Sequence, residues 1–299
     1  GTDRTGAYAI PNQVGIHVRN SNDNEIGGNV PEKGNRISGN TGHGLVIYDN
    51  ASGNLVQFNP IGLNATALAL GNGGDGIFLN QNAVDTSITD NTIAHNDSAG
   101  VAVLATAINN AIRGNAVYDN AGLGIDLGGD GVTRNDRAGD PDTGPNLLQN
   151  YPLLDAADPS TGKVAGSLVA APSTKYVIDF YRSSVCDPSQ YGEGEAYLGE
   201  DNVTTNGSGV VSLAPNLSGF KDGDFITALA TDPKGNTSEF SACVKASTIA
   251  PPPTPTPTAT PGPSPTPTAT ATPGPSPTPT ATPGPSPTPT ATATRGPPP

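Results

Sequence analysis

The residues best suited to chemistry are five aspartates that fall within one short stretch, residues 126–142. Glycine and asparagine are interleaved with them, and carboxylates so closely spaced repel one another unless water or a shared cation screens their charge. Ca²⁺ accepts such oxygen ligands in flexible geometry, although the spacing does not fit an EF-hand loop. We therefore expect a structural Ca²⁺ site, with a solvated, turn-rich loop as the alternative. The five residues are Asp126, Asp130, Asp136, Asp140 and Asp142.

A repeat organises the chain before these aspartates. The openings Gly76-Ile-Phe-Leu, Gly100-Val-Ala-Val and Gly124-Ile-Asp-Leu fall 24 residues apart, 100 minus 76 and 124 minus 100. Inside each unit an asparagine or threonine is followed by an isoleucine or valine and a further asparagine, a spacing that is not helical. Short apolar triplets between asparagine and glycine predict a solenoid of stacked β-coils. We expect about five coils in residues 1–127.

Stacking places equivalent residues about 4.8 Å apart in successive coils, so apolar and turn positions must recur. Two aliphatic columns fit the first strand: Ile16, Leu45, Ile77, Val101, Ile125 and Val18, Ile47, Leu79, Val103, Leu127. The other strands give Ile26, Val56, Ile88, Ile112 and Ile37, Ile61, Ile93, Val117. Asparagine tolerates left-handed bends, and its amide donates to one coil while accepting from the other. Two ladders are predicted: Asn35, Asn59, Asn91, Asn115 and Asn40, Asn64, Asn96, Asn120.

Two insertions interrupt the period, at residues 30–34 and 63–71. Insertions in solenoids bulge outward, commonly on the functional face, and tolerated surface loops are the alternative interpretation. The segments 1–15 and 62–76 both run 14 residues from glycine to glycine, which indicates that the chain begins in the middle of a coil. Since methionine is also absent, we expect an N-terminally truncated solenoid, with further coils and an export signal upstream.

The N-x-I-x-x-N spelling, the G-I-x-V openings and loops such as Gly1-Thr-Asp-Arg-Thr-Gly resemble the right-handed parallel β-helix repeat proteins, the pectate-lyase-like superfamily. The resemblance covers the first two-fifths of the chain and implies an all-β fold there. The superfamily includes polysaccharide lyases, polygalacturonases, alginate epimerases and cell-surface proteins without known catalysis. The resemblance therefore specifies the fold far better than the activity.

Catalytic signatures of that superfamily are sparse. Gly42-His43-Gly44 resembles the G-H-G of polygalacturonases, but that family's Asp-Asp pair, N-T-D and R-I-K are absent. Lyases of this fold use Arg or Lys beside calcium, and no basic residue of the repeat is visibly paired with carboxylates of neighbouring coils. These residues are Arg4, Arg19, Lys33, Arg36 and Arg113. Because no hydrolase-type Ser/His/Asp order and no thiol occurs in the repeat, we predict no catalytic residue.

Side chains that alternate with the aliphatic columns should point outward. They are His17 and Arg19, followed in later coils by Val46 and Tyr48, Phe78 and Asn80, and Ala102 and Leu104. Rings and amides on a flat ladder can stack on sugar faces and bind hydroxyl groups. We predict carbohydrate binding at His17, Arg19, Tyr48, Phe78 and Asn80, the alternative being aromatics that merely cover a β-surface.

Residues 151–248, which follow a connecting loop at 128–150, lack the coil pattern. Alternating segments begin at Lys163, Tyr176, Glu195, Gly209 and Phe225, which predicts a β-sandwich. Residues 230–240 resemble the closing hairpin of bacterial immunoglobulin-like modules. Cys186 and Cys243 are the only cysteines, and we predict a disulfide between them, with two buried thiols as the alternative.

The last segment, residues 249–299, is a proline- and threonine-rich repeat, and 20 of the 31 prolines lie after Ala250. A segment without apolar side chains to bury cannot form a core. We predict a disordered, extended spacer of the polyproline type, whose threonines are candidate sites for O-glycans.

Charge and hydropathy exclude several partner classes. A formal charge of -13 argues against nucleic acid and anionic membranes, and no apolar run reaches the length of a membrane span. We predict a secreted or cell-surface β-solenoid scaffold that binds polysaccharide or envelope material without catalysis. The alternatives are a polysaccharide lyase or glycoside hydrolase with catalytic coils upstream, and a structural spacer that binds nothing.

Overall fold

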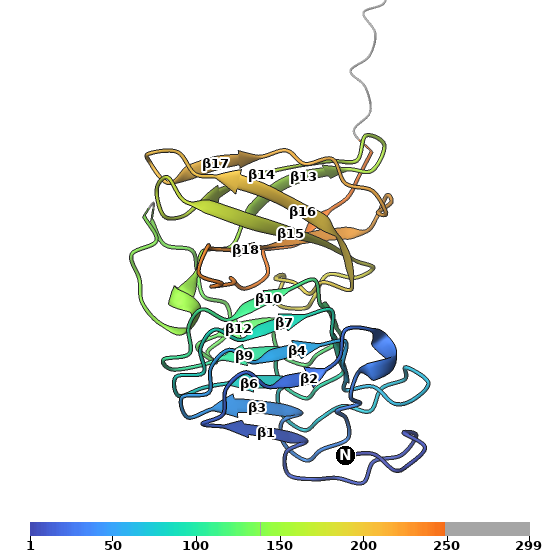
Figure 1. Ribbon diagram of the computed structural model, residues 1–299. Helices are drawn as coiled ribbons and strands as arrows, with labels where there is room; N and C mark the ends of the chain where they lie inside the picture. The colour runs from blue at the N-terminus through green and yellow to red at the C-terminus, as the bar shows by residue number, and fades with distance from the viewer. Residues whose placement is uncertain (138, 249–299) are drawn as a thin grey trace, which may run out of the picture. The chain divides into compact units, whose positions relative to one another are not determined.

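The computed structural model describes residues 1–137 and 139–248, which belong to one compact unit. Three parallel sheets come first in the chain and two antiparallel sheets follow (Figure 1). The all-β fold and the parallel pairing of the repeat are therefore confirmed. Within this part of the chain, no helix has the length and apolar character of a membrane span. The predicted spacer at 249–299 lies outside the described residues.

The first parallel sheet takes one strand from each successive coil, in the order β1-β3-β6-β9-β12. Its strands are β1 (Ile16–Arg19), β3 (Leu45–Tyr48), β6 (Ile77–Leu79), β9 (Val101–Val103) and β12 (Ile125–Leu127). The register pairs Ile16 with Leu45 and Leu45 with Ile77, and it continues through β9 to β12, so both predicted aliphatic columns are confirmed. From Leu45 onward both columns are buried. We call the coils that contain β1 to β12 the coil stack.

The other two sheets of the coil stack are built from still shorter strands. The second contains β2 (Glu25–Gly27), β4 (Leu55–Gln57), β7 (Ser87–Thr89) and β10 (Ala111–Arg113), and the third contains β5 (Pro60–Ile61), β8 (Thr92–Ala94) and β11 (Ala116–Tyr118). Each strand directs one aliphatic side chain inward, and the predicted columns are in register. All inward columns meet in one hydrophobic core, which fixes the direction of the outward side chains.

The first asparagine ladder is confirmed. The Asn59 side-chain amide donates to Asn91 Oδ1 at 2.9 Å, and the Asn91 amide donates to Asn115 Oδ1 at 2.9 Å. Asn35 precedes them and donates to Asn59 Oδ1 at 3.3 Å. From Asn35 to Asn91 each amide donates to the next asparagine toward the C-terminus, so the ladder has a direction. The amide of its last member, Asn115, donates to the Ile88 and Arg113 carbonyls.

The second ladder contains Asn72 where Asn64 was predicted. Asn40 donates to Asn72 Oδ1 at 2.7 Å, and the ladder continues through Asn96 to Asn120. Asn64 instead lies in the inserted loop, where its Oδ1 accepts the backbone N–H groups of residues 66 and 68. The prediction was wrong because the insertion precedes the closing bend of its coil, so the ladder position follows the loop. The other insertion contains a 3₁₀ turn, η1 (Pro31–Lys33).

The two antiparallel sheets have the orders β13-β14-β17 and β16-β15-β18-β19. Their strands are β13 (Leu153–Asp158), β14 (Lys163–Val169), β15 (Lys175–Ser183), β16 (Ala196–Thr204), β17 (Val210–Leu213), β18 (Phe225–Thr231) and β19 (Val244–Lys245). Strands from both sheets share one hydrophobic core. We call β13 to β19 the antiparallel module, and its resemblance to immunoglobulin-like modules stays a prediction. The sequence did not predict β13, because Leu153 is 45% exposed and breaks the alternation.

Cys186 and Cys243 form the predicted disulfide, with an S–S distance of 2.03 Å. The bond ties the connection between β15 and β16 to the segment that leads into β19. The only two cysteines of the chain are thereby paired.

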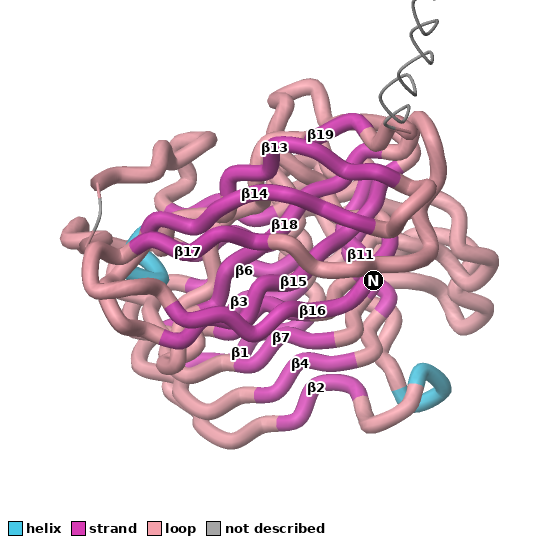
Figure 2. The backbone as a smooth tube through the Cα atoms, turned by 90° about the horizontal axis from the view of Figure 1, so that it is seen from above, coloured by secondary structure: helices cyan, strands magenta, loops and turns pink. Residues whose placement is uncertain are grey.

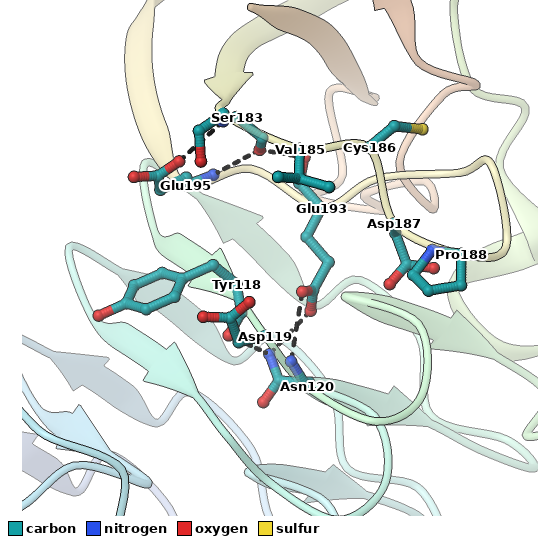
Figure 3. A pocket seen from close by; sticks show the side chains of 11 residues that line it. Tyr118, Asp119, Asn120, Ser183, Val185, Cys186, Asp187, Pro188, Glu193 and Glu195 are labelled. Atoms are coloured by element: carbon teal, nitrogen blue, oxygen red, sulfur yellow. Dashed lines mark hydrogen bonds between the residues drawn. The ribbon is translucent and has the colours of Figure 1, made fainter.

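Seen from above in Figure 2, strands of the antiparallel module lie over those of the coil stack. A side chain of the module binds the last asparagine of the second ladder. Glu193 accepts the Asn120 side-chain amide at Oε1, 2.8 Å away, and the Asn120 backbone N–H at Oε2, 3.3 Å away (Figure 3). The next residue, Gly194, exchanges two backbone hydrogen bonds with Val117 in an antiparallel bridge, which pairs the open edge of β11. Because the ladder amides donate toward this end, an acceptor-only carboxylate is a suitable terminal partner.

Other groups satisfy the remaining exposed backbone of the last coil. Asn146, in η2 (Pro145–Leu148), accepts the Asn110 N–H at 3.0 Å, and Glu239 Oε1 accepts the Leu127 N–H at 3.0 Å. The Phe240 ring joins the core of the coil stack. Unpaired backbone groups and apolar side chains at the end of a solenoid are costly, so the antiparallel module acts as its cap.

One ion-pair network also joins the coil stack to the cap. Arg113, at the end of β10, donates to both carboxylate oxygens of Asp179 at 2.7 and 2.9 Å, and it contacts Glu200 at 2.6 Å. Asp179 is fully buried, and its hydrogen bond with the guanidinium raises the pKa of Arg113 above its usual range. A buried charge held in this way depends on its partner, which couples the two parts.

The carboxyl groups of two capping residues, Glu193 and Glu239, have raised pKa values. Burial raises the pKa of Glu193 to about 7, against the lowering effect of its bonds to Asn120. Burial likewise raises the pKa of Glu239 to about 7. An ordinary glutamate in the unfolded chain titrates near 4.5. Between these two values the folded chain holds protons that the unfolded chain has lost, so stability from these groups falls as pH rises.

Substitution of the central ladder residue should destabilise the protein strongly. Asn91→Ala removes Oδ1, which accepts both the backbone N–H and the side-chain amide of Asn59, and it takes the amide donor away from the Val56 carbonyl. Each buried unsatisfied group costs about 1–3 kcal/mol. We expect a loss of about 3 kcal/mol or more in the free energy of unfolding, measured by urea denaturation. Asn29→Ala, at an exposed position, should change it by less than about 0.5 kcal/mol. Equal effects of the two substitutions would contradict a stabilising ladder.

The capping carboxyls predict a pH dependence of stability. Glu193→Gln removes one titrating group. The unfolding free energy of the wild type, relative to that of the variant, should therefore fall between pH 4.5 and pH 7 and stay constant above pH 7. Each unit of pKa elevation corresponds to about 1.4 kcal/mol. Urea denaturation across this pH range measures the difference, with Glu32→Gln in η1 as the control for loss of one exposed carboxylate. A difference that is constant with pH would refute the assignment.

Candidate functional site

The outward face of the first parallel sheet carries two columns of side chains. One column contains His17, Val46, Phe78, Ala102 and Asp126, which the register places side by side. The other begins with Arg19 beside Tyr48. Because the inward columns are locked in the core, these outward side chains are held about 4.8 Å apart from coil to coil. Their order confirms the register from which the sequence predicted a binding face.

Three of the predicted carbohydrate-binding residues gather at the N-terminal end of this face. The His17 and Tyr48 rings lie 5.5 Å apart, and the Arg19 guanidinium lies 5.7 Å from the centre of the Tyr48 ring. Arg19 Nε also donates to Asp49 Oδ2 at 2.8 Å. Arg19 is thus paired with a carboxylate of the next coil, a pair that was not visible in the sequence. The side chains of Arg19 and Asp49 are 66% and 34% exposed.

Phe78 forms a second ring pair with His43, whose part in this face the sequence did not predict. The two rings stack with centres 4.5 Å apart and an angle of 24° between their planes. His43 Nδ1 lies 3.1 Å from Oδ2 of Asp75, which is itself buried and accepts the Ala99 N–H at Oδ1. Burial opposes ionisation of Asp75, but its bonds, led by that to His43, hold its pKa below the usual value.

A glycine makes room for the histidine ring. A Cβ atom at Gly74 would lie 2.8 Å from His43 Nδ1, so any larger residue would displace the ring. The Gly73-Gly74-Asp75 sequence before β6 was the signal that could have indicated a close approach. Asn80, the fifth predicted residue, binds within its own turn, since its Oδ1 accepts the Gln81 N–H at 2.7 Å.

The five aspartates of the predicted Ca²⁺ site divide into two groups. Asp136, Asp140 and Asp142 converge, with one carboxylate oxygen of each within 4.8 Å of the others. Oδ1 of Asp140 and Oδ1 of Asp142 are buried and have no hydrogen-bond partner among the described residues. Burial, followed by the charges of its two neighbours, raises the pKa of Asp140 to about 7. Such a cradle of poorly satisfied oxygens fits the hard-cation chemistry of Ca²⁺.

Asp126 and Asp130 are not members of this group. Asp126 belongs to β12 and occupies the outward column after Ala102, and its Oδ1 accepts the Gly129 N–H. Burial raises the pKa of Asp126. The sequence grouped the five aspartates by their closeness and did not predict this division, because β12 holds Asp126 in the sheet while the chain turns away after it.

Comparisons with known proteins bear on the fold. Residues 11–137 match the family described as "Right handed beta helix region". Among solved structures, the chain is similar to the enzymatically active domain of tailspike protein 2 of bacteriophage CBA120, with a TM-score of 0.25 and 11% sequence identity. The match covers 80% of this chain and 52% of the tailspike chain, so this chain spans about half of the tailspike chain's length. No curated protein matches the sequence. The family match and the parallel registers agree that residues 11–137 form a right-handed β-helix.

Proposed function

We propose that the protein binds carbohydrate on the outward face of β1, β3 and β6, as an extracellular scaffold without catalysis in this chain. The observation that carries this proposal is the presence of two aromatic pairs on neighbouring coils, His17 with Tyr48 and His43 with Phe78. Val46, which is 6% exposed, lies between His17 and Phe78 in the same column. The rings and this valine therefore border one another on three adjacent strands.

The arrangement suits a chain of sugars better than a small enclosed ligand. Three coils separate equivalent positions by a total of about 10 Å, twice the strand spacing, on a surface that the core holds rigid. Aromatic faces stack on the apolar faces of sugar rings, while paired charges such as Arg19 and Asp49 offer hydroxyl groups both donors and an acceptor. Polysaccharide or cell-envelope material is the proposed partner.

An exported location is part of the proposal. Its support is the Cys186–Cys243 disulfide, because such bonds persist in oxidising compartments and are rare in the cytosol. A secreted or surface-held protein would also meet polysaccharide directly.

We further propose that Asp136, Asp140 and Asp142 hold a structural Ca²⁺ ion. Two buried carboxylate oxygens without partners support this assignment, since a cation would both bind them and relieve the repulsion among the three charges. The site lies in the loop that leads from the coil stack into the antiparallel module, so the ion would order that connection.

A polysaccharide-active enzyme is the second candidate function, and the His43–Asp75 pair favours it. Asp75 holds the imidazole in place, since its backbone N–H donates to His43 Nδ1 at 3.1 Å and its carboxylate lies 3.1 Å from the same nitrogen, and a histidine held in this way can act as a general base. The first candidate ranks higher, because no further carboxylate or nucleophile is in contact with His43 among the described residues.

Glycan binding can be measured on the whole chain with a glycan array, together with reducing-end and unsaturated-uronide assays on the glycans that bind. We expect retention without cleavage, and we expect Phe78→Ala and Tyr48→Ala each to weaken binding about tenfold, the contribution of a stacked aromatic ring. Tyr118→Ala removes a ring from the His95–Tyr118 pair on the third sheet and serves as the matched control.

The outcomes separate the three hypotheses. Cleavage products that disappear in His43→Asn would establish the enzyme and refute a scaffold. Equal loss of binding in Tyr118→Ala would refute this face as the site. Absence of any glycan binding would favour the structural spacer.

Calcium should raise the thermal stability of the protein. A ligand that binds only the folded state adds stability, and each kcal/mol raises Tm by about 2–4 °C in a chain of this size. We expect a higher Tm in millimolar Ca²⁺ than in EDTA for wild type and for Asp130→Asn, and no difference for Asp140→Asn, by differential scanning calorimetry. Identical wild-type Tm values in the two buffers would refute the site, and loss of the response in Asp130→Asn would refute its assignment to three aspartates.

A further inference from the structure

The cationic groups of the proposed binding face are already engaged with carboxylates. Arg19 Nε is 2.8 Å from Asp49, and His43 Nδ1 is 3.1 Å from Asp75. His17, the third group that can carry positive charge, packs against the Tyr48 ring. Asp49 balances the charge of Arg19, so this end of the face carries no unpaired fixed cation among its described residues.

The rest of the face provides no positive charge either. The first outward column continues through Phe78 and Ala102 to a carboxylate, Asp126. Asn80 and Leu104, which follow the ends of β6 and β9, are uncharged. The chain as a whole has a formal charge of -13, so its long-range field repels polyanions.

Recognition of an acidic sugar would require a different arrangement. A carboxylate or sulfate is bound well by a guanidinium that is free to make two parallel hydrogen bonds. Here Asp49 binds Nε of Arg19, so an acidic sugar that reached the Nη groups would lie beside the Asp49 carboxylate, whose negative charge repels it. A neutral sugar meets no such cost, because its hydroxyl groups can donate to Asp49 and accept from Arg19 without breaking the pair.

We infer that the face selects uncharged polysaccharide and rejects uronate and sulfated polymers. This inference rests on the proposed carbohydrate-binding function and specifies its ligand class. The Arg19–Asp49 pair is the selecting element, since Asp49 cancels the charge that would otherwise attract an anion and also supplies an acceptor for sugar hydroxyls. The partially exposed side chains of both residues can be reached from solvent.

A panel of polymers tests the selection. The whole chain is titrated with neutral polymers (glucan, mannan, xylan and galactan) and with acidic ones (polygalacturonate, alginate and dextran sulfate), at about 50 mM and about 500 mM NaCl, where screening differs strongly. We expect at least one neutral polymer to bind with an affinity that does not change with salt, and we expect no binding of the acidic polymers.

Asp49→Asn provides a gain-of-function test. The substitution keeps the shape of the side chain and suits the left-handed backbone at this position, where φ is 58°. It frees the charge of Arg19, so the variant should acquire binding of polygalacturonate that weakens at high salt. Its affinity for the neutral polymer should fall about tenfold, because a charge-assisted acceptor is lost. The control is Asp90→Asn, an exposed aspartate with φ of 56° that lies outside the face and makes the same change in net charge.

Each outcome decides the inference. Salt-sensitive binding of an acidic polymer by the wild type would overturn the selection of neutral polymers while leaving carbohydrate binding intact. Gain of polygalacturonate binding in Asp90→Asn as well as Asp49→Asn would show that net charge, not the Arg19–Asp49 pair, controls selection. Failure of every polymer, neutral and acidic, would instead refute the proposed function from which the inference starts.

Discussion

The structure depends on one constraint: each coil must have its hydrogen bonds completed by a neighbour on both sides. The strands are only two to four residues long, so no coil could hold its shape alone. The asparagine ladders add a direction to this constraint, since each bond from one asparagine amide to the next runs toward the C-terminal end. The second ladder ends on an acceptor outside the coils, because the Asn120 amide donates to the carboxylate of Glu193.

This requirement gives the antiparallel module a structural role. Side chains of the module and of its connections, with the Gly194 backbone, stand in for a further coil, and the Phe240 ring completes the core. The burial of acceptors such as Glu193 and Glu239 raises their pKa values, so capping is coupled to proton binding. The Arg113–Asp179 pair adds a bond whose loss would leave a charge buried.

Rigidity in the coil stack also creates the face that we propose for binding. Because the inward columns cannot move, the outward rings are presented at a fixed spacing. The same stacking that aligns Tyr48 with Arg19 brings Asp49 to the guanidinium, so the electrostatic character of the face follows from the register. The proposed selection against acidic polymers therefore needs no structural element beyond the stacked coils themselves.

The sequence alone determined the coils, the inward columns and the first ladder, because stacking forces equivalent positions to repeat the same residue types. It also determined the outward side chains, since alternation along a strand follows directly from the inward positions, and it predicted the disulfide from the only two cysteines. These features could be predicted because they repeat, and the predictions failed where the repeat is interrupted. Because of the inserted loop, the ladder position is Asn72 and not the predicted Asn64. Strand β13 was not predicted, because an apolar residue, Leu153, occupies an exposed position in it.

Only the tertiary structure decided the contacts between residues that belong to no repeat. The His43–Asp75 pair joins two turns 32 residues apart, and Arg113 meets Asp179 across 66 residues. The aspartates separated into Asp136, Asp140 and Asp142 on one side and Asp126 on the other, because β12 ends between them. Glu193 could not have been recognised as the end of a ladder from its sequence position. Such contacts join residues that do not recur along the repeat, so no periodic pattern in the sequence could predict them.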